Sequence, residues 1–233
     1  QLVAIMSGRL TLSLLALAPL AHGRSLMKCE TTVKAGDGAI EVELWPMTAP
    51  YGVQRLIDLV DDEFFTDLPF YHAQPHMFLF GLHPDYKKQR AQERKGDVRD
   101  DPFPSVGIPG EPGLLCFSGD PGKPPFGKDS RSHILFFTRD EKHLLSNRRT
   151  PWEVPIGKIV KGLDVLAAIN DEYGDQPMMG MLNSTNVNRP AGYPDAAKYW
   201  AHYPNFDKFR SCEVVRDRQP ASDPMANRPH DEL

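Results

Sequence analysis

Residues 70–81 read Phe70-Tyr71-His72-Ala73-Gln74-Pro75-His76-Met77-Phe78-Leu79-Phe80-Gly81. Pro75 lies near the middle of this segment and excludes an ordinary helix through it, because proline lacks the backbone N–H that a helix interior requires. Ala39–Leu44, towards the N-terminus, alternates apolar and charged residues, which is typical of a half-buried strand.

Further strands are predicted towards the C-terminus. Gly113–Ser118 and Ser132–Thr138 are short continuous apolar runs, which indicate buried strands. The residues between them, Gly119–Lys128, are rich in glycine and proline and are predicted to form turns. Val154–Gly162 is another predicted strand, and a glycine ends it.

Two helices are predicted from apolar residues at helical spacing. The first is indicated by Val53, Leu56, Ile57 and Val60. The second, shorter one is indicated by Leu163, Leu166, Ala167 and Ile169. The polar segment 83–107 is interpreted as a solvated loop or a short surface helix, not as a binding patch.

The composition indicates one soluble, turn-rich domain. The chain has 233 residues, of which 22 are proline and 18 are glycine, and these are scattered along it. Many turns and short elements favour a barrel over a helix bundle. The net charge of -4 argues against the basic surface that nucleic-acid binding requires. Neither an internal repeat nor a linker between large domains is recognisable.

Residues 1–23 have the plan of a secretory signal peptide. Arg9 precedes an apolar run from Leu10 to Ala21, and the small residues Ala21 and Gly23 predict cleavage after Gly23. A membrane anchor is the alternative interpretation, but the apolar run is shorter than the roughly 20 residues that a spanning helix needs. We therefore expect secretion, with no membrane segment after cleavage.

The chain ends in His230-Asp231-Glu232-Leu233, which matches the HDEL signal for retrieval to the endoplasmic reticulum. The polar residues before it have little to bury, so residues 217–233 are expected to be a flexible tail that exposes this signal. The expected location is the lumen of the endoplasmic reticulum, and the HDEL retrieval receptor is an expected partner.

The lumen permits disulfides, and it makes the sequon at Asn183 a usable glycosylation site. Cys29 and Cys212 lie in the first and last predicted strands. If these strands pair, a disulfide would join the two ends of the domain; three free buried thiols are the alternative. Cys116 lies in an apolar run and is predicted to be part of the core.

Residues 70–81 resemble the signature strand of the cyclophilins, the prolyl cis/trans isomerases, which reads roughly F-[HF]-R-V-[IV]-P-x-F-x-x-Q-x-G. Phe70, Pro75 and Gly81 stand at the family's spacing. Two later segments also occur in cyclophilin order, Gly113–Ser118 and Ile156–Val165. The resemblance covers Lys28 to Arg216, and Asp100-Asp101-Pro102 and Tyr199–Phe209 are similar to a subgroup found in algae and protists. The implied fold is all-β, a closed eight-stranded antiparallel barrel capped by two α-helices.

The resemblance also implies the residues of a proline-binding groove. His72 stands where the family has its catalytic arginine. The implied substrate-binding positions hold Met77, Phe80, Phe117, Ser118, His133, Leu135 and Leu144, with Trp152 as an alternative to Leu144. The family's chemistry needs no metal, cofactor or nucleophile, because the site only weakens the resonance of an X-Pro bond while that bond rotates.

Two functional hypotheses follow. Arginine presents a fixed fork of charged donors, whereas a neutral histidine donates one hydrogen bond. The protein is therefore either a peptidyl-prolyl isomerase with an altered site that assists folding in the lumen, or a weak or inactive module that binds proline-containing segments. A monomer is expected in both cases. A metal site at His72, His76, His83 and His133 is disfavoured because Pro75 breaks the helical spacing, and no G-x-S-x-G context supports a hydrolase serine.

Overall fold

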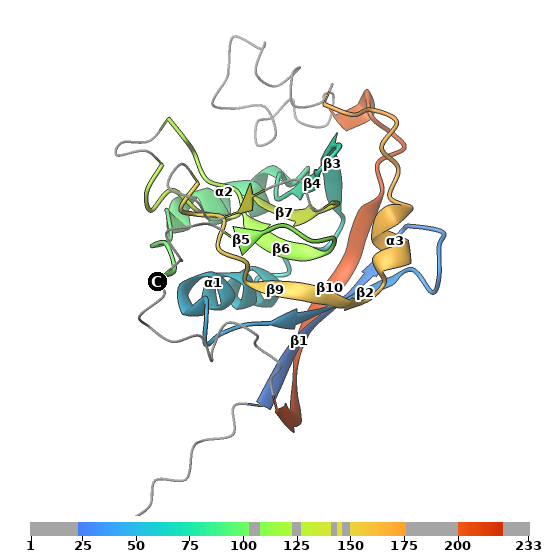
Figure 1. Cartoon of the computed structure of the whole chain (residues 1–233). Helices are drawn as coiled ribbons and strands as arrows, with labels where there is room; N and C mark the ends of the chain where they lie inside the picture. The colour runs from blue at the N-terminus through green and yellow to red at the C-terminus, as the bar shows by residue number, and fades with distance from the viewer. Residues whose placement is uncertain are drawn as a thin grey trace, which may run out of the picture.

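The computed structural model describes residues 23–102, 108–122, 127–140, 144–145, 150–175 and 200–220. Their main feature is a closed barrel in which neighbouring strands are antiparallel and follow the order β1-β10-β3-β4-β7-β6-β9-β2 (Figure 1). The strands are β1 (Gly23–Thr31), β2 (Ala39–Leu44), β3 (Leu68–Gln74), β4 (Met77–Phe80), β6 (Leu114–Phe117), β7 (Leu135–Thr138), β9 (Gly157–Lys161) and β10 (Lys208–Pro220). The predicted eight-stranded barrel is confirmed.

Outside the strands of the barrel, the described residues also form the helices α1, α2 and α3 and a small sheet. The helices are α1 (Pro50–Asp61), α2 (Tyr86–Lys95) and α3 (Leu163–Ala167), and the small sheet consists of β5 (Ile108–Pro109) and β8 (Leu144–Leu145). Figure 1 shows α1 and α3 on different sides of the barrel. They are the two predicted helices, whereas α2 forms from part of the polar segment for which a loop or a surface helix was expected. The Asp85 side chain caps α2 by accepting a hydrogen bond from the Lys87 backbone N–H at 2.7 Å.

Helix α1 is held in place by a buried ion pair. It begins at Pro50, a position where the missing N–H of proline costs nothing. The Asp101 carboxylate accepts hydrogen bonds from the backbone N–H groups of Tyr51 (2.8 Å) and Gly52 (3.0 Å). The same carboxylate pairs with the fully buried Arg131 at 2.8 Å. This pair fixes the start of α1 against the segment that leads into β7.

The main core fills the barrel interior. Its side chains come from all eight barrel strands and from α1 and α3, so the cluster must lie inside the barrel. Phe80 is at its centre, with ring centroids 5.7 Å from Phe70, 5.1 Å from Phe209 and 5.2 Å from Phe137. A second hydrophobic cluster uses the alternate residues of β4, β6 and β7, which face outwards because strand side chains alternate between faces. We call this second cluster the outer cluster.

The first and last strands close the barrel. Cys29 lies directly opposite Cys212 in the β1–β10 ladder, and a disulfide joins them. The structure therefore contains the disulfide, and not the free buried thiols that were the alternative for Cys29 and Cys212. Cys116 is free and fully buried in the outer cluster.

The β1–β10 ladder extends from the pair Thr31 and Phe209 to the pair Gly23 and Pro220, and the second of these ends lies outside residues 28–216, over which the domain was expected. The ladder continues because Gly23, Ser25 and their neighbours find backbone partners in the residues after Val215. The rest of the expected signal peptide, the HDEL sequence and Asn183 lie outside the described residues. Among the described residues, no helix has the length and hydropathy to cross a membrane.

Candidate functional site

The outer face of β3, β4, β7 and β6 carries the candidate site. Met77 and Leu79 project from β4, Phe136 from β7, and Cys116 from β6, and all belong to the outer cluster. Gly81 ends the segment with a φ of 116°, a conformation that favours glycine, and a Cβ there would collide with the backbone of His133. Gly81 therefore permits close contact between the end of β4 and the residues just before β7.

A β-bulge in β3 decides where His72 points. Phe70 pairs with Phe80, but His72 pairs with Leu79, so Tyr71 and His72 together oppose one residue of β4. An extra residue of this kind breaks the simple alternation and re-aims a side chain. Because of it, His72 shares the outer face with Leu79.

The His72 side chain is buried and uncharged. It is 4% exposed, and its Nδ1 has no hydrogen-bond partner among the described residues. Burial lowers the pKa of His72 below its ordinary value of 6.5, although the charge of Asp175 acts in the opposite direction. At neutral pH the position therefore offers one neutral donor or acceptor in place of a charged fork.

Tyr71, which the sequence did not single out, is the second polar group on this face. Its side chain is fully buried, and its hydroxyl has no hydrogen-bond partner in the described part of the chain. Burial raises the pKa of Tyr71 well above its ordinary value, so the hydroxyl keeps its proton. Tyr71 therefore remains a hydrogen-bond donor throughout the working pH range.

Three residues expected in the groove lie inside the barrel. Phe80, Phe117 and Leu135 belong to the interior core, so their side chains point away from the outer face on which a peptide would bind. The reason is the period of two along a strand: a shift of one residue moves a side chain to the other face. The outward positions are held instead by Leu79, Cys116 and Phe136, which no motif in the sequence marks as site residues.

His133 was expected in the groove, but it lies under α2. Its Nε2 is 2.9 Å from the Gln89 amide nitrogen, and its Nδ1 is 3.0 Å from the Ser132 hydroxyl. The backbone N–H of His83 donates to Gln89 Oε1 at 2.8 Å, so the Gln89 nitrogen is the donor towards His133. Burial lowers the pKa of His133 to about 4, and its role here is structural.

This low pKa predicts a loss of stability in acid. The unfolded His133 has the ordinary pKa of 6.5. Between pH 6.5 and about pH 4, His133 is therefore protonated in the unfolded chain but stays neutral in the folded protein. Stability is therefore complete above pH 6.5 and decreases as the pH falls to 4. Because one pKa unit corresponds to about 1.4 kcal/mol, His133 is expected to account for a loss of about 3 kcal/mol. Urea unfolding at several pH values measures it, and an equal decrease in a His133→Gln variant would contradict the assignment.

The remaining expected site residues are dispersed over the structure. Met77 is half-buried and contacts the outer cluster, and Ser118 is partly exposed directly after β6, where its backbone N–H donates to the Ile134 carbonyl. Leu144 pairs with Pro109 in the small sheet. Trp152 is buried against Gly119 and Gly127, where a Cβ would collide with its ring, so it fills the glycine-rich loop.

The edge of the site next to β3 is covered by the chain's own aromatic rings. We call Tyr173, Trp200, Tyr203 and Phe206 the aromatic cover; all four belong to or contact the outer cluster. Tyr173 stacks edge-on against Tyr203 and Phe206, at 5.2 and 5.1 Å between ring centroids. Backbone hydrogen bonds from β3 to Gly174 and Asp207 hold the cover beside Tyr71 and His72.

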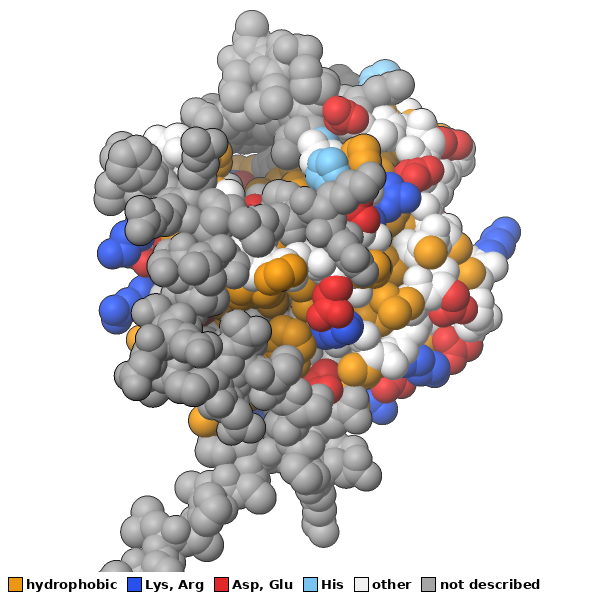
Figure 2. Space-filling model, in the orientation of Figure 1, with side chains coloured by type: hydrophobic (Ala, Val, Ile, Leu, Met, Phe, Trp, Pro, Cys, Tyr) orange, Lys and Arg blue, Asp and Glu red, His pale blue; other side chains and the backbone are white. Residues whose placement is uncertain are grey.

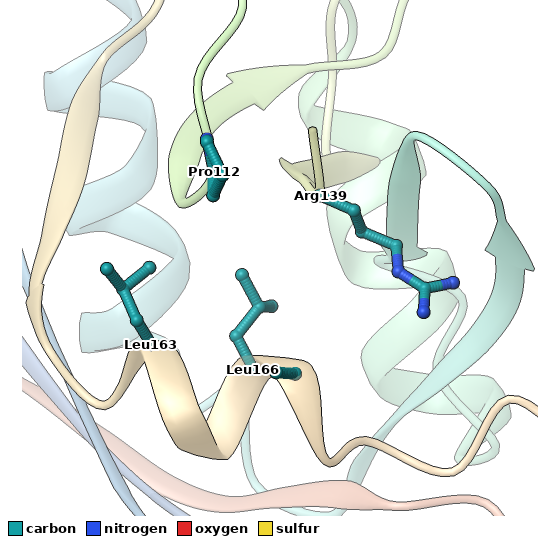
Figure 3. A pocket seen from close by; sticks show the side chains of 5 residues that line it. Pro112, Arg139, Leu163 and Leu166 are labelled. Carbon is teal, nitrogen blue, oxygen red and sulfur yellow. The ribbon is translucent and has the colours of Figure 1, made fainter. Parts of the chain in front are cut away.

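A separate pocket of about 210 Å³ lies at the end of the barrel beside α3. Figure 3 shows Leu163 and Leu166 of α3 facing Pro112 across it, with Arg139 at one side. The Arg139 guanidinium already binds the Gln74 carbonyl and the Asp171 carboxylate, each at 3.0 Å. Figure 2, drawn in the orientation of Figure 1, shows hydrophobic side chains near the centre of the view, where β6 and β9 lie in Figure 1. In the described ranges, no three metal-ligating side chains are grouped to hold an ion.

Comparison with known proteins identifies the family. The family model of the cyclophilin type peptidyl-prolyl cis-trans isomerases matches residues 27–187. A cyclophilin type isomerase of Cryptosporidium parvum superposes with a TM-score of 0.51 at 11% identity, covering 83% of this chain and 99% of that one. The same isomerase determined in the presence of the dipeptide Ala-Pro gives a TM-score of 0.50 at 12% identity, with the same coverage.

A cyclophilin of Mimivirus is similar over 85% of this chain and 93% of its own, at 16% identity and a TM-score of 0.48. Identities this low show the fold alone. No curated protein matches the sequence. Because the family model spans well over half of the sequence, the chain belongs to the cyclophilin-type peptidyl-prolyl cis-trans isomerase family.

Proposed function

We propose that this protein is a folding factor of the endoplasmic reticulum lumen that binds proline-containing segments and isomerises them weakly. The observation that carries the proposal is the state of His72. It stands at the position of the family's arginine and the bulge turns it to the outer face, yet it is buried and neutral. The site therefore retains an apolar surface for proline but lacks a charged donor.

The chemistry explains why activity should be weak. Rotation about an X-Pro bond has a barrier of roughly 18 to 20 kcal/mol, and the imide nitrogen becomes more basic as conjugation is lost. A preorganised charged donor aimed at that developing charge contributes a few kcal/mol. A neutral imidazole contributes less, because hydrogen bonds of charged groups are about twice as strong as those between neutral groups.

The lumenal location rests on the signal peptide expected at residues 1–23 and on the HDEL sequence at residues 230–233. The Cys29–Cys212 disulfide supports it, because structural disulfides persist in oxidising compartments. Recognition of proline is supported by the structure of the Cryptosporidium parvum isomerase determined with Ala-Pro. Co-localisation of the tagged protein with a lumenal marker tests the compartment; diffuse cytosolic staining would contradict it.

The His72→Arg variant tests the function. We expect the wild type to turn over a proline-containing tetrapeptide slowly, and the variant to raise kcat/KM by at least about tenfold, because the arginine restores a charged donor. Asp175 lies close enough to influence His72 and supplies a counter-charge for the new guanidinium. A protease-coupled isomerisation assay measures the rates.

The matched control is His76→Arg, which adds the same charge four residues away, at the turn between β3 and β4, and is expected to leave the rate unchanged. Wild-type turnover equal to that of an arginine-containing cyclophilin, with no gain in His72→Arg, would refute a weakened site. Denaturant unfolding of both variants ensures that the rates refer to folded protein.

A further inference from the structure

Two neighbouring side chains of β3 carry buried polar atoms that have no hydrogen-bond partner among the described residues. They are the Tyr71 hydroxyl and His72 Nδ1, which belong to side chains that are 0% and 4% exposed. A buried polar group without a partner destabilises a folded protein, and such groups are rare unless a ligand or a water completes them. Their position next to each other, within an apolar cluster, points to a ligand with matching polar groups.

The backbone of β3 brings the two groups together. The bulge places Tyr71 and His72 opposite Leu79, so consecutive residues share one face. Their ring centroids are 6.4 Å apart. Alternate residues of an extended chain are separated by about 6.6 Å, so a short extended peptide is long enough to span two rings at this separation.

Both groups can donate. The Tyr71 hydroxyl keeps its proton because burial raises its pKa, and the neutral imidazole of His72 donates from Nδ1 when its proton sits there. A proline-containing segment offers the complementary set, because each proline keeps its carbonyl acceptor and lacks the N–H donor. A pair of donors in an apolar site therefore fits a proline-containing backbone better than an ordinary one.

We propose that Tyr71 is a binding residue of the peptide site, whose hydroxyl donates to a backbone carbonyl of a proline-containing segment while His72 donates to a second carbonyl. This inference rests on the function proposed above and adds its recognition chemistry. In the structure the aromatic cover closes the site. Of its rings, Tyr173, Trp200 and Tyr203 are partly exposed and Phe206 is buried, so the three partly exposed rings are the ones that an entering peptide displaces.

Tyr71→Phe tests this role, because it removes only the hydroxyl. Titration calorimetry with a blocked Ala-Pro-containing tetrapeptide is expected to show an affinity about fivefold lower than that of the wild type, the effect of one neutral hydrogen bond. The urea midpoint of the unliganded variant is expected to stay the same or rise, because an unpartnered buried hydroxyl is lost. A hydroxyl with a structural role would instead lower that midpoint.

Tyr51→Phe is the matched control: Tyr51 is exposed on α1, and its loss of a hydroxyl should change neither quantity. If Tyr71→Phe bound the tetrapeptide as tightly as the wild type, or if its urea midpoint were lower, the binding role of Tyr71 would be wrong. The proposed function would not be affected by either result. No binding of the tetrapeptide by the wild type would overturn the proposed function and this inference with it.

Discussion

Replacing both Cys29 and Cys212 with serine is expected to lower the free energy of unfolding by about 4 to 5 kcal/mol. The disulfide joins residues 183 apart in sequence, and a cross-link over so long a loop removes much of the entropy of the unfolded chain. It also lies within the β1–β10 ladder, which closes the barrel. Without it, that closure depends on backbone hydrogen bonds and packing between strands from opposite ends of the chain.

Urea unfolding with and without a reducing agent measures the effect. The wild type should lose stability on reduction, and the double serine variant should be unaffected by it. Cys116→Ala is the control, because Cys116 is free and buried elsewhere, so this variant should keep its sensitivity to reduction. If the oxidised wild type and the double variant unfolded at the same urea concentration, the bridge would not stabilise the barrel.

The second large effect is expected for Phe80→Ala, which should lower the free energy of unfolding by about 3 to 5 kcal/mol. Phe80 is fully buried, and its ring contacts Phe70, Phe137 and Phe209 in the barrel interior. Truncation removes apolar contact area and leaves a cavity that rigid strands cannot fill. Met77→Ala is the matched control on the outer face; because Met77 is half-buried, it should cost about 1 kcal/mol or less.

Denaturant unfolding distinguishes these positions directly. If Phe80→Ala lost little stability but much of its peptide affinity, Phe80 would line the groove, and its inward orientation would be wrong. If the alanine variant fails to fold, Phe80→Leu serves in its place, with a smaller expected loss. Peptide affinity in that variant should remain near that of the wild type, because the side chain does not reach the outer face.

The sequence was sufficient for the elements whose side chains follow one clear period. Val53, Leu56 and Val60 are buried on α1 as their spacing predicted. For helix α2 the sequence does not distinguish a loop from a helix, because its buried residues, Gln89 and Gln92, are polar and produce no apolar stripe. Their burial depends on partners far away in sequence, such as His133 for Gln89.

The candidate site was less predictable. His72 could be placed by its spacing from Phe70 and Pro75, but its burial and neutral state depend on elements packed around it. Tyr71 shows no pattern that marks it as functional. Its hydroxyl lies beside the equally unpartnered His72 Nδ1, in the part of the chain that the structure describes, only because the bulge in β3 turns His72 to the same face.

Residues 70–81 indicated the family, and together with the segments that follow in cyclophilin order they predicted the barrel, because local patterns of apolar residues, glycine and proline set the order of strands, turns and helices. They did not determine which side chains face the site. Phe80 could line the groove or fill the core, and the register of β4 against β3 and β7 placed it inside. Side chains alternate along a strand, so one bulge or a shift of one residue exchanges the two faces. That register is set by pairing between distant segments, and only the folded barrel brings those segments together.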